Sequence, residues 1–241
     1  MILVQLSWLH SGEEIISILM RIYRQCPLTD ANAAQSADYA VVFIGGFVDW
    51  LIGISWRMCR DFAGFDIPMK GIKGFYHWDG GSWGMLSDGC LGIADDLNAL
   101  ITVNSALHLI LIGHSYGASA AMEVARHLDS SHRGELMVLT IDAVSRRQSS
   151  TRAAGVDFWG NAFLSRGGGL LDAVPRIGGR WGGCPDADVN LSYDGYSRDR
   201  MGRLYSHRDP VPMLWDTPDR EGYEKSLIGM VRDRLNRLEF Q

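Results

Sequence analysis

The segment Gly113-His114-Ser115-Tyr116-Gly117 places a serine between two glycines, in the pattern Gly-x-Ser-x-Gly. Because glycine has no Cβ, the chain around Ser115 can turn sharply and push the hydroxyl out into a cleft. A serine presented on such a turn has the position of a nucleophile. The pattern alone is a weak signal, because the chain contains 28 glycines and a chance match is easy.

The sequence on either side of this turn makes the signal stronger. Residues 107–112 are almost all apolar, as expected for a strand buried on both faces of a sheet. Residues 117–128 are rich in Ala, Met, Glu and Leu, which favour a helix. The N-terminal amides of that helix would point toward the place where negative charge develops in a reaction at Ser115. The alternative is a tight strand-to-helix turn that needs small residues and performs no chemistry.

A serine nucleophile needs a base, and His207 is the best candidate. It lies in the loop Tyr205–Pro212, shortly before the expected last helix, and it is the one histidine downstream of Asp142. A loop histidine at the carboxyl edge of a sheet can reach over a serine turn. The alternative is an ordinary surface histidine. The histidines that precede Asp142 are His10, His77, His108, His114, His127 and His132.

A carboxylate is needed to orient that base, and Asp142 is the favoured one. It directly follows the apolar run 136–141, so its side chain is expected at the same sheet edge as Ser115. Asp186 and Asp188 remain rivals, and Asp209 is too close to His207 in sequence for an easy approach. The alternative role for Asp142 is a turn or a helix cap.

The oxyanion of an acyl-transfer reaction needs two donors. The first expected donor is the backbone N–H of Tyr116, directly after the serine. The second is expected from the turn Gly45-Gly46-Phe47, with Phe47 N–H preferred and Gly46 next. These glycines would otherwise serve only close packing of a strand on a helix.

The remaining pattern predicts one α/β domain over residues 1–241, with a mostly parallel sheet and helices on both faces. Residues 164–186 are expected to be a glycine-rich loop, either a lid or a solvated loop of no consequence. Strands are expected at 39–44, 72–78, 107–112, 136–141, 156–163 and 187–193. Helices are expected at 49–62, 90–104, 117–128 and 219–238.

Composition excludes several classes of protein. The formal net charge is −5 with no basic stripe, which argues against nucleic acid as a partner. The four cysteines are far apart, so we expect no metal site, and nothing indicates a cofactor. The segment Ile15–Ile22 predicts an amphipathic helix that packs on the domain rather than on a membrane surface. Without a recognisable signal peptide, a cytoplasmic location is the default expectation, with signal-independent secretion as the alternative.

The order Ser115, Asp142, His207, with a glycine turn after an upstream strand, resembles the α/β-hydrolase superfamily. Gly113–Gly117 is similar to the nucleophile elbow of small lipases and esterases, and residues 139–145 are similar to their strand-then-aspartate segment. The resemblance covers about residues 39–212 and implies a trimmed α/β-hydrolase fold and an acyl-enzyme mechanism. Gly45-Gly46 replaces the usual His-Gly pair, which leaves the exact oxyanion donor open.

We therefore expect a serine hydrolase that cleaves small-molecule or lipid carboxylic esters. The side chains expected to contact the substrate are Trp50, His114 and Trp181. A weaker similarity to lipase-like bacterial effectors, over the general plan and residues 182–207, suggests a lipid-hydrolysing toxin with an immunity-type protein partner. A further alternative is a binding protein that keeps the fold without turnover.

Overall fold

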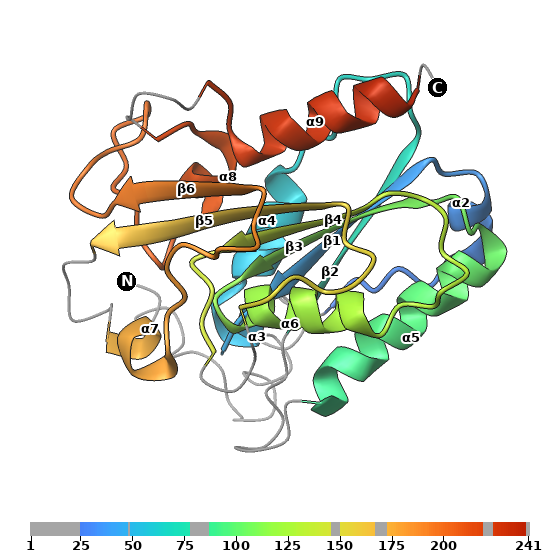
Figure 1. Ribbon diagram of the computed structural model, residues 1–241, viewed down its shortest axis with the longest axis horizontal. Helices are drawn as coiled ribbons and strands as arrows, with labels where there is room; N and C mark the ends of the chain where they lie inside the picture. The colour runs from blue at the N-terminus through green and yellow to red at the C-terminus, as the bar shows by residue number, and fades with distance from the viewer. Residues whose placement is uncertain are drawn as a thin grey trace, which may run out of the picture.

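The computed structural model describes residues 25–47, 49–77, 87–145, 150–166, 173–218 and 224–239, and six parallel strands form a sheet in it (Figure 1). The strand order is β2-β1-β3-β4-β5-β6, and each strand pairs in parallel with its neighbours. The strands are β1 (Tyr39–Gly45), β2 (Gly71–His77), β3 (His108–His114), β4 (Leu136–Ile141), β5 (Phe158–Arg166) and β6 (Val189–Asp194). The predicted α/β class with a mostly parallel sheet is confirmed.

Helices cover both faces of the sheet (Figure 1). Helices α5 and α6 bury their apolar residues against one face, and α4, α8 and α9 against the other. The helices of the described residues are α2 (Ala31–Gln35), α3 (Asp49–Ile52), α4 (Ile54–Asp61), α5 (Ser87–Val103), α6 (Tyr116–Arg126), α7 (Ala173–Gly178), α8 (Val211–Trp215) and α9 (Leu227–Leu238).

The central strands are buried along almost their whole length. All residues of β1 and β4 are buried, and in β3 only the first, His108, is partly exposed. Strands covered by helices on both faces must be apolar on both faces, which explains the continuous apolar runs in the sequence.

The chain reverses its direction of travel across the sheet between β1 and β3. From β1 it passes to β2 at one edge, and from β3 it moves stepwise toward β6 at the other edge. In an open parallel sheet, the loops that leave two such neighbouring strands diverge and form a crevice at the carboxyl ends. Here those loops begin at Gly46 and Ser115.

The expected helix over residues 49–62 is wrong in one respect, because it is broken at Gly53. This glycine has a left-handed backbone, with φ 68° and ψ 39°, and separates α3 from α4. Glycine adopts this conformation without the steric penalty that a Cβ imposes. The side chain of Asp49 then accepts hydrogen bonds from the first amides of α4, Ile54 N at 2.5 Å and Ser55 N at 3.2 Å.

The described part of residues 164–186, where a glycine-rich loop or lid was expected, contains regular structure. Residues 164–166 complete β5, and Ala173–Gly178 form α7. Trp181 and Cys184 are buried among the core residues on the α5–α6 face. Burial of these side chains anchors the segment to the body of the protein, so it is not a solvated loop.

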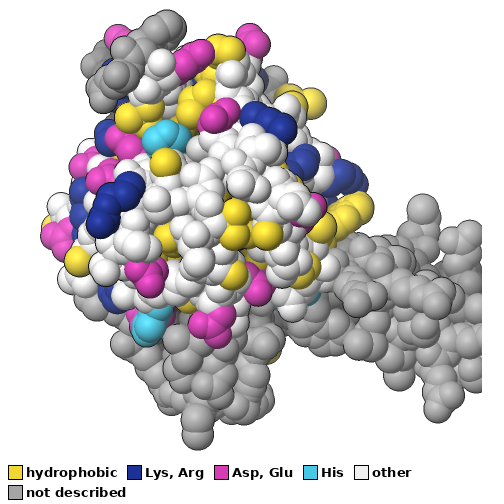
Figure 2. Space-filling model, turned by 90° about the vertical axis from the view of Figure 1, so that its right-hand side faces the viewer, with side chains coloured by type: hydrophobic (Ala, Val, Ile, Leu, Met, Phe, Trp, Pro, Cys, Tyr) yellow, Lys and Arg dark blue, Asp and Glu magenta, His cyan; other side chains and the backbone are white. Residues whose placement is uncertain are grey.

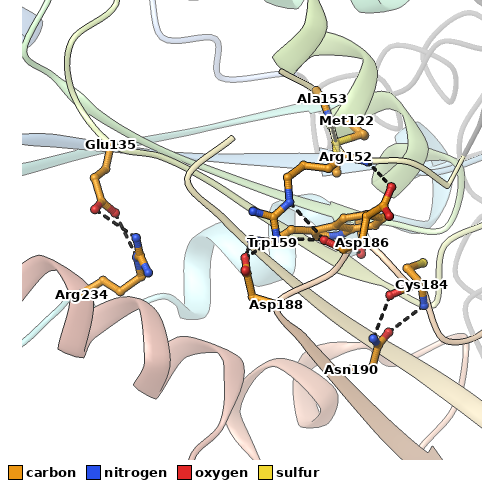
Figure 3. A network of polar contacts seen from close by, with 11 residues as sticks. Met122, Glu135, Arg152, Ala153, Trp159, Cys184, Asp186, Asp188, Asn190 and Arg234 are labelled. Carbon is orange, nitrogen blue, oxygen red and sulfur yellow. Dashed lines mark hydrogen bonds and ion pairs between the residues drawn. The ribbon is translucent and has the colours of Figure 1, made fainter. Parts of the chain in front are cut away.

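Ion pairs at the amino ends of the strands fasten the later part of the sheet (Figure 3). Arg152 pairs with Asp188 at 2.6 Å and donates to the backbone oxygen of Asp186, while Arg234 of α9 forms two hydrogen bonds with Glu135. Asp188 also accepts from Trp159 N at 2.8 Å. Both rivals of Asp142 therefore lie before β6, away from the carboxyl edge.

Acidic and basic side chains are interspersed on the face at the amino ends of the strands (Figure 2). Among the described residues, no helix is long and apolar enough to cross a membrane. The amphipathic helix expected at Ile15–Ile22 lies outside the described residues.

Candidate active site

Ser115 occupies the sharp turn between β3 and α6. Its φ of 58° and ψ of −127° are unusual for a residue with a side chain. Neither flanking glycine has room for a Cβ. A Cβ on Gly113 would lie 2.3 Å from the backbone oxygen of Gly117, and a Cβ on Gly117 would lie 2.2 Å from the backbone oxygen of Ile44. The tight packing of strand and helix therefore requires both glycines of the motif and holds Ser115 in a strained conformation.

A continuous chain of hydrogen bonds joins Ser115, His207 and Asp142. His207 Nε2 is 3.0 Å from Ser115 Oγ, and His207 Nδ1 is 2.6 Å from Asp142 Oδ2. Because an ionised carboxylate only accepts, Nδ1 carries the proton and Nε2 is the acceptor for the serine hydroxyl. Three residues from distant parts of the sequence thus meet at the carboxyl ends of β3 and β4, as the sequence predicts.

The carboxylate of Asp142 is fully buried and has several partners. Its Oδ1 accepts from Leu164 N at 3.3 Å. Arg180 approaches both oxygens, with Nη2 donating to Oδ2 at 3.1 Å and Nε 3.1 Å from Oδ1. The backbone of Asp142 has φ 43°, a second left-handed residue at this edge. A buried charge is tolerated when it is paired and hydrogen-bonded in this way.

The turn after β1 lies directly against the serine. A Cβ built on Gly46 would be 2.6 Å from Ser115 Cβ and 3.1 Å from Ser115 Oγ. The backbone of Gly46 thus faces the space beside the nucleophile, where only glycine fits. Phe47 follows with an exposed side chain, and Tyr116 begins α6 immediately after the serine. The structure thus places Gly46 against Ser115, while the roles of Phe47, Gly46 and Tyr116 as oxyanion donors stay predictions.

His114 is buried and packs against the ring of His207. Its ring centroid is 4.7 Å from that of His207, and the ring planes are tilted by 44°. Burial, reinforced by the neighbouring His207, lowers the pKa of His114 to about 3, so its ring is neutral at ordinary pH. The side chain is only 2% exposed, and contact of His114 with a substrate stays a prediction.

The structure describes one of the two tryptophans expected to contact substrate. Trp181 is a core residue on the α5–α6 face and is 7% exposed, and its contact with substrate stays a prediction. Trp50 belongs to α3, but its side chain lies outside the described residues.

Asp49 holds the turn after β1 together, a role that sequence reasoning missed. Besides capping α4, it hydrogen-bonds to His77 Nδ1 at 3.1 Å and accepts from Ser55 Oγ. Its backbone N–H donates to Gly46 O at 3.1 Å. His77 ends β2, so this cluster ties the turn to the neighbouring strand. The position of Asp49 shortly after one expected strand and of His77 near the end of another is the signal that could have revealed them.

Arg180 was also missed, and no local signal points to it. It lies 38 residues from Asp142 in the sequence, within a glycine-rich segment. Within the described residues there is no cluster of three or more His, Cys, Asp or Glu side chains suited to a metal ion.

Comparison with known proteins adds little to this description. No family model matches the chain, and no curated protein matches it significantly. Among solved structures, an iodinated complex of acetyl xylan esterase is similar with a TM-score of 0.33 and 12% sequence identity. The match covers 65% of this chain and 83% of the esterase chain.

Proposed function

We propose that the protein is a serine hydrolase that cleaves carboxylic esters. The observation that carries the proposal is the hydrogen-bonded chain from Asp142 through His207 to Ser115, with Ser115 held in a strained turn. A serine hydroxyl at neutral pH is a poor nucleophile, and this arrangement supplies both a base and a group that orients it.

In the proposed reaction, Ser115 Oγ attacks the ester carbonyl carbon while His207 Nε2 takes the hydroxyl proton. The tetrahedral intermediate carries its negative charge on the former carbonyl oxygen, and the N–H groups of Phe47 and Tyr116 stabilise it. The C–O bond to the alcohol then breaks, and His207 returns the proton to the leaving oxygen. Water, deprotonated by His207, hydrolyses the acyl-enzyme and restores Ser115.

The N-terminus of α6 would also stabilise the negative charge on the former carbonyl oxygen. This helix begins at Tyr116 and extends to Arg126, so its amide dipoles point toward the region beside Ser115 Oγ. A partial positive charge at a helix N-terminus stabilises a nearby anion, and its effect is greatest where water is excluded.

Exposed apolar side chains next to the site favour an apolar acyl or alcohol group in the substrate. Phe47 is 53% exposed on the turn that touches Ser115, and Ile177 is 68% exposed beside Gly178. A Cβ on Gly178 would meet the hydroxyl of Tyr116, so α7 lies close to the site. Leu204 is also exposed, three residues before His207.

A covalent fluorophosphonate probe tests the proposal directly, since it labels a serine activated by a base. Labelling of the wild-type chain, its loss in Ser115→Ala and hydrolysis of p-nitrophenyl esters are the expected results. No labelling of folded wild-type protein would favour a binding protein without turnover. A series of p-nitrophenyl esters of increasing chain length would then define the acyl preference.

A further inference from the structure

We infer that Arg180 is a positioning residue that acts through Asp142 and extends the activity of the enzyme to lower pH. The inference rests on the proposed function. The carboxylate of Asp142, which faces His207, also faces the permanent positive charge of the Arg180 guanidinium.

The position of Arg180 is fixed by the backbone around it. Ser145 N donates to Gly179 O at 2.9 Å, and Trp181 N donates to Ala143 O at 2.8 Å. Arg180 and Val144 form an isolated antiparallel bridge between these two hydrogen bonds. The residue on either side of Arg180 is thus paired with the stretch immediately after Asp142, which brings the guanidinium to the carboxylate.

The contact between the two side chains is close and sheltered. Asp142 Oδ2 accepts from both His207 Nδ1 and Arg180 Nη2, and Arg180 Nε is 3.1 Å from the other oxygen. The side chain of Arg180 is 18% exposed and that of Asp142 is fully buried. Screening by solvent and salt is weak at such a site, so the guanidinium also acts electrostatically on the histidine, though from farther away than the carboxylate.

The charges predict how His207 responds to pH. A lone buried carboxylate strongly favours the imidazolium form, in which the histidine cannot act as a base. A guanidinium on the same carboxylate opposes the added positive charge. Arg180 therefore keeps His207 in its neutral, basic form at a lower pH than Asp142 alone would allow.

Other charged groups near His207 stay the same when Arg180 is replaced. His114 is neutral beneath the ring, and Arg57 of α4 acts electrostatically on His114. The charged residues of the segment that carries His207 are Arg198, Asp199, Arg200, Arg203, Arg208 and Asp209, of which Arg203 pairs with Asp199 and lies 3.9 Å from Asp209. A shift in the titration of His207 on replacing Arg180 is thus assignable to the lost charge.

The test is the NMR titration of the His207 ring, which requires no turnover. The His207 signal is assigned by its loss in His207→Gln. In Arg180→Met we expect the midpoint to rise, by on the order of 1 pH unit, because the positive charge that opposes the imidazolium is lost. In Arg180→Lys, which keeps the charge, the midpoint is expected to stay close to the wild-type value.

Arg152→Met is the matched control, because it removes another paired arginine, at the amino ends of the strands (Figure 3). Its midpoint should equal that of the wild type. If Arg180→Met does not fold, Arg180→Gln removes the same charge. An unchanged midpoint in either neutral, folded variant overturns the inference.

The fluorophosphonate labelling rate, measured against pH, separates this inference from the proposed function. The acidic limb of the rate profile should move to higher pH in Arg180→Met and stay in place in Arg152→Met. Unlabelled wild-type protein would refute the proposed function, while the NMR midpoints still decide the role of Arg180. If the wild type is labelled but neither the NMR midpoint nor the acidic limb shifts in Arg180→Met, the role of Arg180 is refuted and the proposed function stands.

Discussion

His114 lies directly against His207, with ring centroids 4.7 Å apart. His114 is the last residue of β3 and immediately precedes Ser115, so consecutive residues supply the proposed nucleophile and the ring that packs against His207. The side chain of His114 is almost completely buried, whereas that of His207 is 12% exposed. A rigid, neutral ring from the central strand therefore limits how far His207 can tilt away from Ser115.

The first prediction concerns stability at acidic pH. His114 binds a proton near pH 6.5 in an unfolded chain, but its pKa is about 3 in the folded protein. Below pH 6.5 the unfolded state thus binds more protons, and this residue lowers stability as the pH falls toward 3. The loss approaches about 1.4 kcal/mol per pH unit.

Urea unfolding of His114→Phe at pH 6 and pH 4.5 measures this contribution. Replacement by phenylalanine should remove it, so the variant should lose less stability over this interval than the wild type. His127→Phe, which alters a histidine whose side chain is 43% exposed, should follow the wild type. Equal losses in His114→Phe and wild type would contradict the assigned burial effect.

The second prediction concerns the base. His207→Ala should lower kcat for a p-nitrophenyl ester by at least about a thousandfold, because it removes the ring nitrogen that lies 3.0 Å from Ser115 Oγ. The melting temperature should change little, since the residue lies in a partly exposed segment outside the sheet. His132→Ala serves as a control and should keep full activity. A large loss with His132→Ala but not with His207→Ala would show that the base is misassigned.

The third prediction concerns the space beside the nucleophile. In Gly46→Ala the new methyl group would meet Ser115 Cβ at 2.6 Å and the His114 backbone oxygen at 3.0 Å, so the turn must move. We expect kcat to fall by about a hundredfold, comparable to the loss of one oxyanion donor. In Gly182→Ala the added Cβ has no neighbour within 4 Å, and its activity should match the wild type. Full activity of Gly46→Ala would argue against this turn as the oxyanion loop.

The fourth prediction concerns the cluster around Asp49. Asp49→Ala removes the cap of α4 and the link to His77, and should reduce stability by about 1–3 kcal/mol. It should also lower kcat with little change in KM, because the oxyanion turn loses its support. Asp30→Ala removes the cap of α2, far along the chain from the site, and should reduce stability by about 1 kcal/mol without affecting kcat. An equal kcat effect of both substitutions would leave Asp49 with a purely structural role.

Local sequence was sufficient to predict the strands, the turn at Ser115 and the relative order of Ser115, Asp142 and His207. Continuous apolar runs bounded by glycine and aspartate are typical of buried parallel strands, whose carboxyl ends lie at one edge. The same rule placed Asp142 beside Ser115, whereas Asp188 stayed a rival until the structure showed that it precedes β6. Each of these inferences depends on neighbours in sequence and on the fixed direction of a parallel sheet.

The tertiary structure alone decided which side chains surround those residues. Arg180 reaches Asp142 across 38 residues, and His77 reaches Asp49 across 28, so no local pattern signals either contact. Trp181 fills the core because the segment after α7 folds back along the end of β4. The sequence thus determined which groups lie at the carboxyl edge, whereas long-range packing determined which are buried, which are paired and which carry a neighbouring charge.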